Sequence, residues 1–111
     1  MSDIMLLNDS NFDTEVESNS KPLMVDFYAD WCAPCQLLGP RVEEVAREYK
    51  DKVAVGKVNV DQSLSIPMRF GIQGIPTVLF FKNGVLVDRV VGLVPKEELA
   101  DRLDSLLLEQ N

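Results

Sequence analysis

The sequence predicts an α/β fold in which one mixed sheet carries helices on both faces. Apolar runs of strand length alternate with stretches whose apolar residues recur every three or four positions. Residues 22–29 are nearly continuous in apolar character, as in a strand covered on both faces. Asn83-Gly84 joins two later apolar runs as a hairpin turn. With no repeat or linker, the 111 residues predict one domain spanning 1–111.

The first half of the chain is predicted to alternate helix, strand and helix. Asp9 or Ser10 is expected to cap a first helix that continues to about Ser18, by accepting from its first-turn N–H groups. The strand of residues 22–29 follows, and a helical period then begins at Pro34. Pro40 is expected to kink that helix. Its buried stripe is predicted to contain Leu37, Leu38, Val42, Val45, Ala46 and Tyr49.

The second half is predicted to add three strands and a final helix. Residues 52–60 form a strand, and residues 62–70 are a short irregular or helical stretch. Residues 77–82 and 85–91 form the antiparallel hairpin around Asn83-Gly84. Pro95 suits the first turn of the last helix. The inner stripe of that helix is predicted to be Leu99, Leu103, Leu106 and Leu107.

The excess of acidic residues excludes two classes of binding partner. The chain has 18 Asp and Glu against 11 Lys and Arg, and a net charge of -7. This acidity argues against a nucleic-acid surface and against polybasic attachment to a membrane. No apolar run approaches the length of a membrane span, and residues 1–7 lack the features of a secretory signal. We therefore expect a cytoplasmic location.

The chemistry is expected at Trp31-Cys32-Ala33-Pro34-Cys35, where a buried strand gives way to a helix. The helix N-terminus favours a thiolate at Cys32, and the thiolate is the reactive form of cysteine. Cys35, one turn further, is expected to be less exposed and to resolve a mixed disulfide. The alternative is an inert or adventitious disulfide. With two cysteines and no histidine, a closed zinc site would need ligands from a second chain, so no metal is expected.

Two charged residues interrupt the predicted strands. Asp26 lies within the apolar run 22–29, and Lys57 has the same parity as the apolar residues of the next strand. Burial would raise the pKa of Asp26, and a nearby lysine would partly offset this. In one interpretation Asp26 accepts a proton from Cys35 and Lys57 tunes it. In the other, Asp26 faces a strand edge and Lys57 reaches solvent.

Ile75-Pro76-Thr77 marks a tight turn before a strand, and an ordinary trans bond is the usual form of such a turn. Several small or apolar residues at strand ends or in loops could contact a partner chain, although each could equally serve the core or a turn. These candidate docking residues are Trp31, Gly74, Ile75, Val91 and Gly92.

Taken together, these motifs resemble the thioredoxin family along essentially the whole chain. The matching residues are Val25-Asp26-Phe27, Ala29 through Cys35, Pro40, Lys57, Asn59-Val60-Asp61, Gly71 through Thr77, Phe81 through Gly84, and Gly92. The resemblance implies a five-stranded mixed sheet flanked by four helices. It also implies a cis bond at Ile75-Pro76 facing the cysteines.

The resemblance further implies specific roles. Cys32 would be the nucleophile, Cys35 the resolving thiol, and Asp26 the buried proton acceptor beside Lys57. An extended substrate would pair with the backbone next to Pro76. The implied docking surface consists of Trp31, Ala33, Pro34, Gly74, Ile75, Val91 and Gly92. The implied electron donor is a thioredoxin reductase, and the implied substrates are disulfides of cytoplasmic proteins. Nothing in the sequence demands more than a monomer, and no cofactor is expected.

Three positions depart from the usual pattern of the family. Ala33 replaces a glycine, Tyr28 stands where many members have tryptophan, and Gln36 stands where many have lysine. The methyl group of Ala33 could crowd a docking partner, whereas the loss of one exposed cation should have a small effect. An oxidant or isomerase is disfavoured because such relatives commonly carry histidine between the cysteines. A binding module without redox turnover is the alternative from another class.

Overall fold

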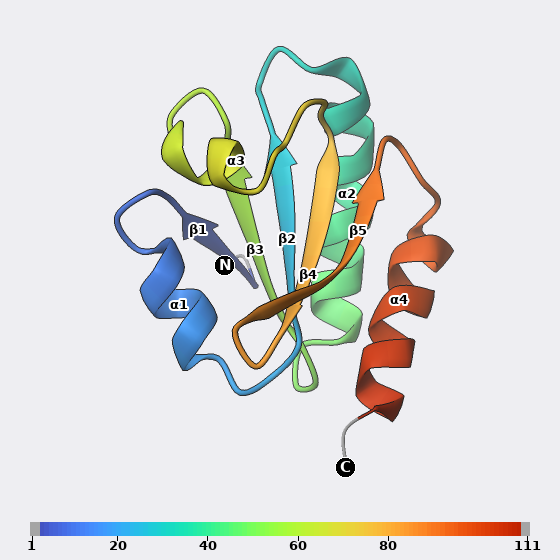
Figure 1. The fold of residues 1–111 in the computed structure, drawn as a ribbon. Coiled ribbons are helices and arrows are strands. Elements are labelled where there is room, and N and C mark those ends of the chain that lie inside the picture. Colours follow the sequence, from blue (N-terminus) through green and yellow to red (C-terminus); the bar gives the residue numbers. More distant parts are fainter. Residues whose placement is uncertain (1–2, 110–111) are drawn as a thin grey trace.

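A five-stranded mixed sheet forms the centre of the molecule (Figure 1). This computed structural model describes residues 3–109, so residues 1–2 and 110–111 of the predicted domain lie outside the described part. The strand order is β1-β3-β2-β4-β5. The strands are β1 (Ile4–Leu7), β2 (Leu23–Tyr28), β3 (Ala54–Asn59), β4 (Thr77–Lys82) and β5 (Val85–Val91). β1 and β2 are parallel to β3, whereas β4 is antiparallel to both β2 and β5.

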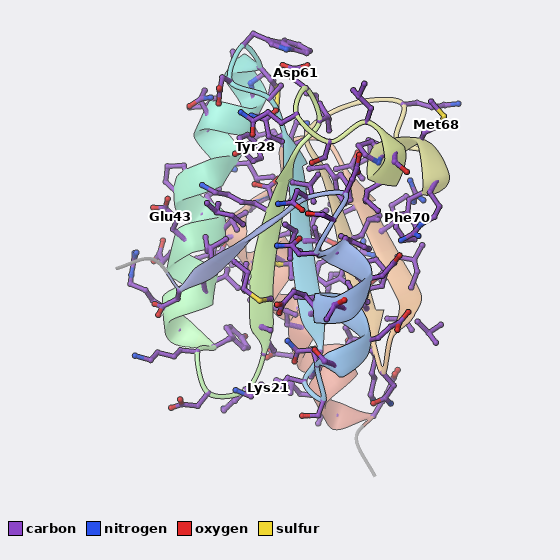
Figure 2. The ribbon with its side chains drawn as sticks, turned by 90° about the vertical axis from the view of Figure 1, so that its left-hand side faces the viewer. Lys21, Tyr28, Glu43, Asp61, Met68 and Phe70 are labelled. Carbon is purple, nitrogen blue, oxygen red and sulfur yellow. A yellow bond between two sulfur atoms is a disulfide. The ribbon has the colours of Figure 1, made fainter. Side chains whose placement is uncertain are left out.

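Four helices cover the two faces of the sheet (Figure 1). On one face lie α1 (Phe12–Ser18) and α3 (Ser65–Arg69), and on the other lie α2 (Ala33–Glu48) and α4 (Lys96–Leu108). Figure 2 shows Glu43 of α2 and Phe70, which follows α3, on opposite sides of the sheet. None of the described helices is long and apolar enough to cross a membrane. The arrangement agrees with the predicted fold class.

The alternation of side chains along β2 explains its continuous apolar run. Leu23, Val25 and Phe27 pack in the core under α1 and α3. Met24 packs in the other core, with residues of α2 and α4. Because successive side chains of a strand point to opposite faces, a strand covered on both sides is apolar at nearly every position. Asp26 is the exception, and the same alternation places it on the α2 face.

The turn between β4 and β5 also follows from its residues. Asn83 and Gly84 both have positive φ, at 54° and 80°. A two-residue hairpin turn of this handedness requires that conformation, which glycine and asparagine adopt at low cost. The hairpin prediction is confirmed, with a register shift between Phe80 and Phe81 in the paired strands.

Other expectations about the helices were wrong. Leu37 is 58% exposed, because it lies about 100° around the helix axis from the buried Leu38. Neither Asp9 nor Ser10 caps α1, whose N-cap is Asn11. The Asp9 carboxylate instead accepts from the N–H groups of Ser65 and Ile66 at the start of α3.

Two further elements refine the sequence analysis. The apolar pattern predicted no strand before the first helix, whereas β1 lies there and pairs with β3 at the edge of the sheet. Pro95 is the N-cap of α4 and not a residue of its first turn. α2 continues through Pro40 as one helix, and the kink expected there stays a prediction.

Candidate active site

A disulfide between Cys32 and Cys35 lies where the chain enters α2. Cys32 is the N-cap residue, and the Cys35 N–H donates to its Sγ over 3.2 Å. The two Cα atoms are 5.2 Å apart, so the first turn of α2 accommodates the bond. The sulfur of Cys32 therefore occupies the position at which a helix N-terminus stabilises negative charge, as the sequence predicted.

The expected difference in exposure between the two cysteines was wrong for this disulfide form. Both residues are 4% exposed. Cys32 is covered because the Ile75 segment crosses it, with the Ile75 carbonyl oxygen 3.8 Å from the Cys32 Sγ.

The carboxyl group of Asp26 is buried beneath the cysteine-bearing helix. Asp26 is 4% exposed, and its Oδ1 has no hydrogen-bond partner among the described residues. β2 lies between β3 and β4, so the interpretation that Asp26 faces a strand edge was wrong. Burial raises the pKa of Asp26 to about 7, and the positive charge of Lys57 acts in the opposite direction.

Lys57 lies next to Asp26 on the parallel strand β3, with their Cα atoms in register. No ion pair within 4 Å joins the two side chains in the described part of the chain. The Lys57 Nζ instead lies 5.5 Å from the ring centroid of Tyr28, within range of a cation–π contact. Lys57 thus acts on Asp26 through space, with its ammonium group over an aromatic face.

A cavity of about 340 Å³ joins the buried carboxyl group to Cys35. Asp26, Cys35 and Lys57 all line it, together with Tyr28 and the surface residue Glu43. A cavity of this size with several polar groups can hold water. Asp26 and Cys35 therefore border a common space through which a proton could pass by way of water.

Opposite the cysteines, the segment before β4 turns sharply. The Ile75-Pro76 peptide bond is cis, so that implication of the resemblance is confirmed. The Thr77 Oγ1 donates to the Gly74 carbonyl, and the Gly92 N–H donates to the Pro76 carbonyl over 2.8 Å. The second bond joins the start of β4 to the end of β5, next to the Ile75 carbonyl that lies against Cys32.

The predicted docking residues come together from three segments around the disulfide. Trp31 is 71% exposed and Val91 is 62% exposed. Ile75 is half-buried against the cysteines. Gly92 has a φ of 95°, a conformation that suits glycine. The remaining members, Ala33, Pro34 and Gly74, are exposed or border the cysteine turn.

Sequence reasoning missed two contacts near this surface. The Trp31 indole donates to Asp61 Oδ2 over 2.8 Å, which fixes the exposed ring. Asp61 lies at the same end of the molecule as Tyr28 (Figure 2). Tyr28 itself supplies the aromatic face for Lys57. The contact with Asp61 spans 30 positions in sequence, so no local pattern signals it.

Within residues 3–109, no cluster of three or more His, Cys, Asp or Glu could hold a metal ion.

Comparison with known proteins gives a consistent result. The family model described as Thioredoxin matches residues 3–105. "Thioredoxin 1" of Synechococcus elongatus is 47% identical over 96% of this chain and 100% of its own length. "Thioredoxin" of Acidithiobacillus ferridurans is 45% identical, again over 96% and 100%. "Thioredoxin M-type, chloroplastic" of Pisum sativum is 40% identical over 96% of this chain and 62% of its own length. The chain therefore belongs to the thioredoxin family of thiol–disulfide oxidoreductases.

Proposed function

We propose that Cys32 and Cys35 carry out a two-step reduction of protein disulfides. In the dithiol form, the Cys32 thiolate attacks a substrate disulfide, a mixed disulfide forms and one substrate thiolate leaves. Cys35 then attacks the Cys32 sulfur, and the second substrate thiolate leaves. Two electrons pass to the substrate, and the chain ends with the Cys32–Cys35 disulfide. The observation that carries this proposal is that disulfide at the N-terminus of α2.

The order of the two cysteines follows from their places on the helix. The Cys32 Sγ accepts the Cys35 N–H at the N-cap, where the helix dipole stabilises a thiolate. Cys35 lines the cavity shared with Asp26, whereas Cys32 does not. Cys35 thus has a proton acceptor within reach, which a resolving thiol needs at neutral pH.

Asp26 is the proposed acceptor of the Cys35 proton. A carboxyl group whose pKa is about 7 is balanced between its two protonation states at physiological pH. The unpartnered Oδ1 leaves room for a water molecule between the carboxylate and the Cys35 thiol. Lys57 keeps the pKa of Asp26 from rising further.

The three segments around the disulfide form the proposed docking surface. Within residues 3–109, the Ile75 N–H makes no hydrogen bond, and the one polar partner of the Ile75 carbonyl is the Cys32 sulfur. Both backbone groups are thus open to an extended chain, as in strand addition. Trp31 and Val91 offer apolar area on either side, and small residues such as Gly74 permit close approach.

Membership of the family implies a thioredoxin reductase as electron donor and disulfide-containing proteins as substrates. We further propose that the chain acts as a monomer in the cytoplasm. A reducing compartment is needed to keep Cys32 and Cys35 available as thiols. One relative is named as chloroplastic, so members of the family serve in more than one compartment.

The test is acceleration of insulin reduction by dithiothreitol, with catalytic amounts of the protein and a Cys32→Ser control. We expect acceleration that disappears in the control. The same acceleration in the control would overturn the role of Cys32. If the parent protein gave no acceleration while still binding partners after both cysteines were changed to serine, the chain would be a binding module.

A further inference from the structure

The segment between β5 and α4, residues 92–95, is held at both ends. Its first residue, Gly92, donates to the Pro76 carbonyl opposite the disulfide. Its last residue, Pro95, is the N-cap of α4 and accepts from the Glu98 N–H. Between these points lie Leu93, which is 40% exposed, and Val94, which packs against the core. Figure 1 shows this segment leading from the upper end of β5 to the start of α4.

Arg41 of α2 holds the middle of this segment. Its Nη1 donates to the Val94 carbonyl over 2.6 Å in a partly buried contact. In the described part of the chain Arg41 forms no ion pair, although Glu44 and Glu97 line the same cavity. Glu44 is instead paired with Lys96. Among residues 3–109, the one side-chain hydrogen bond of Arg41 therefore joins α2 to the 92–95 segment.

This bond connects the two sides of the proposed docking surface. Cys35 and Arg41 are on the same helix, six positions apart. Val91 immediately precedes the segment that Arg41 holds, and Gly92 is the first residue of that segment. The chain at the end of β5 is thus joined to Pro76, next to Ile75 at the disulfide, by the Gly92 N–H, and to the cysteine-bearing helix by Arg41.

We propose that Arg41 is a positioning residue for protein substrates, which fixes the 92–95 segment against α2 so that a disulfide-bearing chain can dock beside it. The inference rests on the proposed docking surface around Cys32. Arg41 does not reach the sulfur atoms, so it acts through Val94 on the shape of the binding site. Reactants too small to contact the 92–95 segment should be indifferent to it.

The test compares Arg41→Met and Arg41→Lys with the parent protein. Methionine retains the aliphatic part of the side chain and the helix propensity but removes the donors, whereas lysine keeps the positive charge and N–H donors at its end. A hydrogen bond from a charged group is stronger than one between neutral groups, so its loss should raise the KM for insulin about fivefold to tenfold. The kcat should stay within about twofold, and Arg41→Lys should recover part of the loss.

Three controls separate positioning from general effects. The rate with dithiodipyridine, a small disulfide, should be the same in Arg41→Met and the parent. Arg47→Met removes the same charge from an exposed site on the same helix and should leave the KM unchanged. Lys96→Met breaks the ion pairs to Glu44 and Glu48, which also join α4 to α2, and should change stability without raising the KM.

Each contrary result has a distinct meaning. An unchanged KM in Arg41→Met, with normal insulin reduction by the parent, would overturn the inference and leave the proposed function standing. An equal loss with dithiodipyridine, or an equal rise in KM in Lys96→Met, would also overturn it, because the effect would not be specific to docking. Failure of the parent to reduce insulin would overturn the proposed function and this inference together.

Discussion

Asp26 and Lys57 lie side by side on adjacent parallel strands, yet their side chains do not form an ion pair. The ammonium group of Lys57 lies over the ring of Tyr28, and Asp26 keeps an oxygen without a hydrogen-bond partner. A close ion pair would hold the carboxyl group ionised. Because no close ion pair forms, the effect of burial on the carboxyl group outweighs the effect of the Lys57 charge, and the pKa of Asp26 rises to about 7. The site thus has a base suited to neutral pH.

The raised pKa of Asp26 predicts a specific dependence of stability on pH. The unfolded chain releases this proton near pH 3.8, whereas the folded chain holds it to about pH 7. The folded state therefore binds more protons in this window, and the free energy of unfolding falls as pH rises through it. Raising the pKa of Asp26 from 3.8 to about 7 lowers the free energy of unfolding by about 4 kcal/mol, and the whole of this loss is present above pH 7. Asp26→Asn should lack this fall.

Urea denaturation of both oxidised proteins between pH 4.5 and pH 8.5 measures the effect, since the disulfide prevents the cysteines from titrating. Hydrogen bonds from Arg69 and Lys96 lower the pKa values of Asp13 and Glu44, respectively, and these groups are present in both proteins. Their contributions to the pH dependence of stability are therefore the same in the parent and in Asp26→Asn, and they cancel when the two free energies of unfolding are subtracted. Parallel curves for the two proteins would contradict the burial of an ionisable Asp26.

Asp26→Asn should also slow the second chemical step. Without the carboxylate, the Cys35 thiol must lose its proton to bulk water, and general-base catalysis typically contributes about 100-fold or more. Stopped-flow single turnovers should show normal formation of the mixed disulfide and slow release of the second substrate thiol. In the parent, the release rate should rise through about pH 7, as Asp26 ionises.

Lys57→Met provides the matched control for this step. Loss of the positive charge should raise the pKa of Asp26 further, so the rise in release rate should move to higher pH without disappearing. Equal release rates in the parent and Asp26→Asn across this pH range would remove Asp26 from the mechanism.

Much of the fold could be predicted because its signals are local. The apolar run around Val25 and Phe27 reflects burial on both faces of the sheet. Asn83 and Gly84 encode a turn of their own. β1 could not be predicted from its apolar pattern, because its short segment mixes exposed, half-buried and buried positions. Its pairing with β3 comes from the assembled sheet and not from its own pattern.

The site divides in the same way. The place of Cys32 at a helix start is a local property and was predictable. Whether Asp26 and Lys57 lie side by side depends on how β2 pairs with β3. The sequence pattern does not determine this pairing, so it allowed both interpretations of the two residues. The Trp31–Asp61 and Arg41–Val94 contacts span 30 and 53 positions. Asp9 shows the same limit, because its capping partners lie in a distant helix.

Cys35→Ser should stop the cycle after the first step. Cys32 can still attack a substrate disulfide, but serine cannot displace the mixed disulfide that results. Insulin turnover should fall to background, and a protein–substrate adduct should accumulate towards one per chain. Mass spectrometry without reductant should detect the adduct, and dithiothreitol should release it. Cys32→Ser should form no such adduct, and its absence in Cys35→Ser would reverse or remove the assigned roles.

Trp31→Ala should weaken docking more than chemistry. The indole is 71% exposed in the free protein and is held by Asp61, so its apolar area is available to a partner without a large ordering cost. Burying an aromatic side chain at an interface typically contributes more than about 1 kcal/mol, which predicts a KM for insulin at least about fivefold higher. The kcat and the rate with dithiodipyridine should change little.

The matched control for Trp31 is Leu108→Ala, which removes a similarly exposed apolar side chain from the far end of α4. Figure 1 shows this end of α4 pointing away from the start of α2, so the KM of this variant should equal that of the parent. Asp61→Asn should give an intermediate KM, because the amide oxygen still accepts from the indole but carries no charge. Equal KM values for Trp31→Ala and the parent would exclude the indole from the docking surface.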